Sequence, residues 1–213
     1  SSDLLALSLL APVGGAVVYH RVAFGCRSYW PLASGLVAYN AAFFMGFMNF
    51  LFSLGLALIG AAAWVALRRR NRSGWKTLAG AIAAVATFFI HIFGLAFLFL
   101  LIGAEEASGL RRRWSSGTVT ARDFMKAAIP ILIALAPALV LYRLSPFSDT
   151  ATSLGAWHAI VKLMRPFSPF TIPNVELTIV TAVAVIVALV AMRRHLAFAP
   201  GLRLAIAVLA IVY

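Results

Sequence analysis

Long apolar runs separated by short basic stretches set the pattern of this chain. A helix needs about 20 predominantly apolar residues to cross the hydrocarbon core of a bilayer. Charged residues gather between the runs and are nearly absent within them, which is typical of transmembrane helices. A soluble amphipathic helix would carry a polar stripe along its whole length instead. The pattern therefore predicts an all-α, polytopic transmembrane helix bundle, with spans at residues 3–24, 41–67, 77–103, 127–142 and 175–192 and a truncated one at 201–213.

The spans 41–67 and 77–103 form the centre of the predicted bundle. The basic turn that joins them, residues 68–76, is short, and this predicts antiparallel, adjacent helices. Small residues recur at four and three spacing on both spans, which lets another helix approach closely. These stripes are Ala42, Gly46, Asn49, Ser53, Gly60 and Ala63 on the first span, and Gly80, Ala84, Thr87, His91 and Gly94 on the second.

Asn49 and His91 are polar members of these stripes. A rise of about 1.5 Å per residue, counted from the basic turn, places both at similar depth in the leaflet far from that turn. An ionisable side chain in mid-span usually faces a bundle interior or a cavity, so His91 is a functional candidate. The alternative is a neutral histidine that hydrogen-bonds to Asn49 between helices. The predicted residues at or beyond this far surface, as substrate or cavity-lining candidates, are Tyr39, Asn40, Asn49, His91, Glu105 and Glu106.

Two connecting segments are predicted to lie at the membrane surface. Residues 31–40 form a half-buried segment ahead of the span that begins at residue 41. Residues 150–165 show an apolar stripe opposite a basic face, the pattern of a helix that lies in the headgroup plane. The basic face would contact anionic lipid or a diphosphate, or only extend toward headgroups; it consists of His158, Lys162 and Arg165.

Composition supports the membrane assignment and limits the partners. Of the 213 residues 63% are hydrophobic and 11% charged, whereas soluble domains carry about a quarter charged residues. The excess of 18 Lys and Arg over 6 Asp and Glu indicates topology signals and contact with anionic membrane lipids, not nucleic acid. Basic residues flank the span 77–103 on both sides, so the sequence leaves the orientation open, although the charge density of 68–76 favours the cytoplasm. Cys26 is the single cysteine, so no intramolecular disulfide can form.

The ends of the chain predict an interior fragment of a longer polytopic protein. The chain begins with Ser-Ser-Asp and stops about 11 residues into an apolar run, which is too short to cross a bilayer. We expect a single transmembrane helical region over residues 1–213, with missing parts of the same chain or partner helices packed around it.

Signatures of soluble enzymes are absent from the sequence. There is no P-loop, no GxGxxG after a strand, no HExxH, no GxSxG, and no pairing of Cys or His at metal spacing. The acidic pair Glu105-Glu106 is a candidate for general-base duty or metal binding. The alternative is a solvated helix end neutralised by Arg111, Arg112 and Arg113. No cofactor is indicated, and a divalent metal stays open.

Two stretches carry a resemblance to a known group of proteins. YNAAFFMGFMNFLFSLGLAL (39–58) and FFIHIFGLAFLFLLIGAEEA (88–107) resemble multi-pass bacterial inner-membrane proteins whose layout is similar to that of GT-C type glycosyltransferases. The resemblance implies a substrate that is a sugar linked to polyprenyl phosphate. In that superfamily the decisive acidic residue lies in the first large extracytoplasmic loop. This sequence contains no such loop, so no catalytic residue is assigned.

Three functions follow as expectations. The first is part of a GT-C-like membrane glycosyltransferase that acts on a lipid-linked sugar in the bacterial inner membrane. The second is a transporter in which His91 relays protons. The third is a non-catalytic membrane subunit whose small-residue stripes dock other helices.

Overall fold

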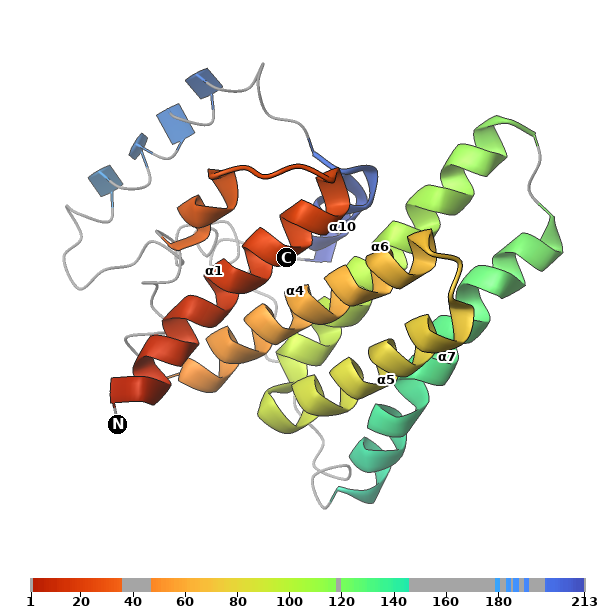
Figure 1. Cartoon of the computed structure of the whole chain (residues 1–213), viewed down its shortest axis with the longest axis horizontal. Helices are drawn as coiled ribbons and strands as arrows, with labels where there is room; N and C mark the ends of the chain where they lie inside the picture. The colour runs from red at the N-terminus through yellow and green to blue at the C-terminus, as the bar shows by residue number, and fades with distance from the viewer. Residues whose placement is uncertain are drawn as a thin grey trace.

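The computed structural model describes residues 2–35, 47–117, 120–145 and 198–212, together with scattered residues between 179 and 191. Every element within these ranges is helical, and the five helices α1 and α4–α7 contain stretches long and apolar enough to cross a membrane (Figure 1). The predicted fold class, an all-α transmembrane bundle, is confirmed. The elements are α1 (Ser2–Phe24), the short 3-10 helix η1 (Trp30–Ala33), α4 (Met48–Arg69), α5 (Ser73–Ile90), α6 (Ile92–Ser115), α7 (Ala121–Leu144) and α10 (Pro200–Val212).

Small residues bring the helices together. Gly55 of α4 lies against Ala11 and Gly15 of α1, so closely that a Cβ at Gly55 would overlap the Ala11 carbonyl. A Cβ at Gly94 of α6 would lie 2.5 Å from the Ser53 side chain of α4. The predicted role of the small-residue stripes in close helix approach is therefore confirmed within the chain itself.

The order of the contacts gives the direction of each helix. Ser53 of α4 lies against Gly94 of α6, and Gly60, further along α4, lies against Leu98, further along α6. The two helices therefore run parallel. Gly60 also meets Ala83, and Trp64, one turn later on α4, meets Gly80, so α5 runs the opposite way. The same reasoning makes α1 parallel to α4. Figure 1 shows that α7 runs in the same direction as α5.

The single span predicted over 77–103 is wrong, because the chain turns back at His91. α5 ends at Ile90 and α6 begins at Ile92. His91 between them is extended, with φ −168° and ψ 128°, and its Nδ1 accepts a hydrogen bond of 3.3 Å from the backbone N–H of Phe93. His91 is thus the N-cap of α6, where its side chain satisfies one of the amides that the first helical turn leaves unpaired. We call this end of the bundle the tip end.

This turn brings both basic loops to the same end of the bundle. The α4–α5 turn, the end of α6 and the start of α7 lie at the same end of the bundle, opposite the tip end (Figure 1). Arg69 joins the end of α1 to the same region, because its guanidinium donates to the carbonyls of Val22 and Ala23. We call this the basic end. From the positive-inside tendency we expect the basic end to face the cytoplasm.

The connection between the predicted spans 77–103 and 127–142 is largely helical. α6 continues to Ser115, and α7 begins at Ala121, where Thr120 and Asp123 form a reciprocal capping box. α7 also continues through Pro130 and Pro137 and is longer than the predicted span 127–142. Transmembrane helices tolerate proline because neighbouring groups can satisfy the freed carbonyl.

Other expectations lie wholly or partly outside the described residues. These are the interfacial helix 150–165 with His158, Lys162 and Arg165, the positions Tyr39 and Asn40, and most of the span 175–192. The segment predicted from residue 201 is helical and forms α10, which packs against α6.

Candidate functional site

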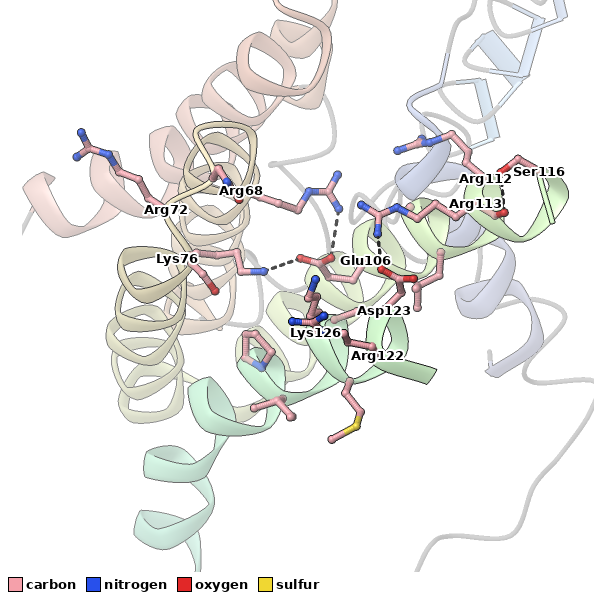
Figure 2. A pocket seen from close by; sticks show the side chains of 18 residues that line it. Arg68, Arg72, Lys76, Glu106, Arg112, Arg113, Ser116, Arg122, Asp123 and Lys126 are labelled. Atoms are coloured by element: carbon pink, nitrogen blue, oxygen red, sulfur yellow. Dashed lines mark hydrogen bonds and ion pairs between the residues drawn. The ribbon is translucent and has the colours of Figure 1, made fainter. Parts of the chain in front are cut away.

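The α4–α5 turn places two cations on the side of the bundle that faces α6. Asn71 adopts φ 54°, in the left-handed region that asparagine tolerates better than most residues, and this conformation lets the chain reverse within a few residues. Arg68 in the last turn of α4 and Lys76 in the first turn of α5 therefore both face α6 (Figure 2).

The two neighbouring glutamates of α6 form ion pairs with these cations. Arg68 donates to Oε1 of Glu105 at 2.6 Å and to the Glu105 carbonyl at 3.0 Å. Glu106 accepts from the Lys76 ammonium at 3.1 Å and lies 3.5 Å from the Arg68 guanidinium. Glu105 and Glu106 are only 12% and 11% exposed, so these are mostly buried ion pairs.

Trp64 completes the ion network. Its Nε1 donates to Oε1 of Glu106 at 2.8 Å, and its ring lies under the Lys76 ammonium at 4.6 Å. Trp64 is fully buried and Lys76 is 6% exposed. A lysine this deeply buried needs a counter-charge, and the carboxylate of Glu106 together with the π-face of Trp64 supplies it.

Glu105 faces a second helix as well. A Cβ at Gly201, in the first turn of α10, would overlap the Glu105 carboxylate. Glu105 therefore lies between Arg68 and the N-terminal turn of α10, where the unpaired backbone amides favour a negative charge.

Next to the ion network, the basic end opens into a cleft of about 1000 Å³. Its walls come from the α4–α5 turn, the last turns of α6 and the first turns of α7. Seven lining side chains are cationic, and two, Glu106 and Asp123, are carboxylates. The cations are Arg68, Arg72, Lys76, Arg112, Arg113, Arg122 and Lys126.

The cations of the cleft fall into two sets. Lys76 and Arg68 pair with Glu106, and Arg113 pairs with Asp123 at 2.9 Å (Figure 2). The remaining four make no ion pair with any carboxylate in the described ranges, and all four are exposed. We call them the outer cations: Arg72, Arg112, Arg122 and Lys126.

One wall of the cleft is apolar. It consists of Leu110 of α6 and of Met125, Ala127, Ile129 and Pro130 of α7. Exposed aromatic side chains flank the same end of the bundle: Trp75 is 62% exposed, Trp114 75% and Phe124 62%. Tryptophan concentrates at the level of lipid headgroups, so we expect the cleft to lie near the membrane–water interface.

Glu105 and Glu106, predicted at or beyond the surface far from the basic turn, lie beside that turn instead. The cause is the reversal at His91, which returns α6 to the basic end. Their expected neutralisation by Arg111, Arg112 and Arg113 is also wrong, since Arg68 and Lys76 are their partners. Sequence reasoning missed Lys76, Trp64, Asp123, Arg122 and Lys126 as residues of one site.

Asn49 and His91 do share one end of the bundle. The ring of Phe50, next to Asn49, meets the His91 ring edge-on at 5.5 Å. Asn49 is exposed, however, and no hydrogen bond joins it to His91 in the described part of the chain. The proposed amide–imidazole pair is therefore not formed.

The acidic residues do not assemble a metal site. Across the described ranges, no group of three or more His, Cys, Asp and Glu side chains is close enough to hold a metal ion. The arrangement of the cleft, with four outer cations beside an apolar wall, suits an anion attached to an apolar chain. Comparison of the chain with protein-family models, with curated proteins and with solved structures finds no match.

Proposed function

We propose that this protein binds the phosphorylated headgroup of a membrane lipid in the cleft at its basic end. The observation that carries the proposal is the imbalance of the cleft: seven cations against two carboxylates, with four cations left without an ion-pair partner among the described residues. Phosphate oxygens accept several charge-assisted hydrogen bonds at once, which is the chemistry that clustered Arg and Lys side chains supply.

The apolar wall favours an amphiphile over a soluble phosphate. Met125 and Ile129 of α7 line the cleft beside the outer cations, and both are exposed. α7 also exposes Leu132 and Ile133, about one turn further along. A lipid can therefore place its phosphate among the cations while its chain follows α7 into the bilayer.

The wider proposal is a GT-C-like glycosyltransferase of the bacterial inner membrane that acts on a lipid-linked sugar. Its support is the resemblance of 39–58 and 88–107 to that group. No catalytic residue is assigned.

Lipid binding tests the proposal. The chain in nanodiscs of a neutral lipid should bind polyprenyl phosphate, and should bind the matching polyprenol and inorganic phosphate much more weakly. Each of Arg122→Gln and Lys126→Gln should reduce the affinity by about fivefold, since a basic residue near an anionic surface contributes about 1 kcal/mol. Arg70→Gln is the matched control, because Arg70 is exposed at the basic end but does not line the cleft.

Two results would contradict the proposal. Equal binding of polyprenol and polyprenyl phosphate would show that the cations take no part. Equal loss of affinity in Arg70→Gln and Arg122→Gln would show general attraction to the basic end rather than binding in the cleft.

A further inference from the structure

Glu106 is the more buried of the two carboxylates that line the cleft, with a side chain that is 11% exposed against 18% for Asp123. Its Oε1 accepts from the Trp64 indole at 2.8 Å and from the Lys76 ammonium at 3.1 Å. Its Oε2 lies 3.5 Å from the Arg68 guanidinium. Asp123, the other carboxylate of the cleft, instead helps to cap α7 and pairs with Arg113, whose side chain is 62% exposed.

In this position Glu106 competes with any phosphate that enters the cleft, because both would bind the same cationic donors. A phosphate oxygen and a carboxylate oxygen seek the same donors, and Lys76 and Arg68 both line the cleft. Glu106 has the advantage because it is held in place by Trp64 and needs no ordering on binding.

We propose that Glu106 is a specificity-determining residue that sets how much negative charge the cleft accepts. The inference rests on the proposed function. By holding Lys76 and Arg68, Glu106 confines an incoming phosphate to the outer cations. The cleft therefore favours a headgroup with one phosphate, and it disfavours a diphosphate whose second group would have to approach Glu106.

Loss of the Glu106 charge would affect Arg68 and Lys76 differently. Arg68 keeps its bonds to Glu105 at 2.6 and 3.0 Å whether or not Glu106 is charged. Lys76 has no carboxylate partner other than Glu106 in the described residues. Loss of the Glu106 charge therefore releases chiefly Lys76.

The test compares polyprenyl phosphate with polyprenyl diphosphate on the whole chain in neutral nanodiscs. Glu106→Gln should raise the affinity for the diphosphate by about fivefold, the effect of one added cation near an anionic group, and should raise that for the monophosphate less. Glu105→Gln removes the same charge from the neighbouring position, which faces Arg68 and α10 instead of lining the cleft, and should change the ratio of the two affinities less than twofold.

A second variant keeps the inference testable if Glu106→Gln alone does not fold. Lys76→Met with Glu106→Gln removes the ion pair as a unit, and such replacements are often tolerated. The double variant should bind both lipids as the wild type does, because Lys76 is held by Glu106 in the wild type and is absent from the double variant. A loss of affinity of fivefold or more in the double variant would show that Lys76 contacts the ligand and would overturn the inference.

The results that would contradict the proposed function differ from those that would contradict the role of Glu106. If the wild type binds neither phosphorylated lipid better than polyprenol, the cleft is not a phosphate site at all. If the wild type binds them and Glu106→Gln leaves the ratio of affinities unchanged, the cleft remains a phosphate site and only the role of Glu106 is wrong.

Discussion

The ammonium of Lys76 and the carboxylate of Glu106 lie 3.1 Å apart, although the two residues are 30 positions apart in the sequence. They meet because α5 leaves the basic end and α6 returns to it. One reversal thus turns two basic loops, which the sequence placed on opposite sides of the membrane, into the walls of a single cleft.

The first prediction concerns topology and uses the native Cys26. Cys26 is the single cysteine of the chain, it is exposed, and it follows α1 at the basic end. If that end faces the cytoplasm, an impermeant maleimide should label Cys26 in inverted vesicles and not in intact cells. In a Cys26→Ser background, Phe93→Cys at the tip end should show the opposite pattern, since Phe93 is 65% exposed. Labelling of both positions from one side would contradict the placement of Cys26 and Phe93 at opposite ends of the bundle.

The second prediction concerns the contact between Gly80 and Trp64. A Cβ at Gly80 would lie 2.7 Å from the indole ring, closer than real side chains approach. Gly80→Ala should therefore destabilise the protein by about 1–3 kcal/mol through overpacking. Gly103→Ala is the matched control: no neighbouring atom lies within 4 Å of its Cβ position, and alanine is the better helix former. Thermal unfolding in detergent measures both, and equal midpoints for the two variants would contradict the packing of α5 on α4.

The third prediction separates two neighbouring arginines of the basic turn. Arg68→Ala leaves Glu105 and part of the Glu106 charge nearly buried without their guanidinium, which should cost about 3 kcal/mol. Arg70→Ala removes an exposed side chain and should change the stability by less than about 0.5 kcal/mol. Both variants lose one positive charge, so a difference in unfolding midpoint reports the ion network and not the net charge. Similar midpoints would mean that the network contributes little.

Much of the fold could be predicted from the sequence because hydropathy is a local and additive signal. Each long helix contains enough apolar residues to be recognised by itself, and the bounds of α1 and the end of α4 fall within two residues of those expected. The small residues also identified the contact faces, since Gly60, Gly80 and Gly94 all lie against another helix.

The reversal at His91 could not be predicted in the same way. A single extended residue hardly changes the mean hydropathy of a stretch long enough to span a membrane. Ile90 and Ile92, on either side of His91, are as apolar as the rest of the run. One signal was present but unused: Thr120 and Asp123 have the spacing of a capping box, which marks the start of a helix within the expected loop. Recognition of that start would have shortened the loop. It would not have shown which end of the bundle the loop occupies, because that depends on the number of crossings before it.

The last prediction concerns His91 itself and distinguishes a structural role from proton transfer. His91 accepts a hydrogen bond from the Phe93 amide as the N-cap of α6, and asparagine is one of the best residues at that position. His91→Asn should therefore keep the stability of the protein and its binding of polyprenyl phosphate, although asparagine cannot titrate. His91→Leu removes the acceptor and should lower the stability by about 1 kcal/mol. A transporter that uses His91 as a proton relay would lose activity in both variants, since neither side chain carries a proton at neutral pH. Thermal unfolding and lipid binding of the two variants, measured side by side, decide between these roles. A His91→Leu protein as stable as the wild type would show that the cap does not hold the α5–α6 turn.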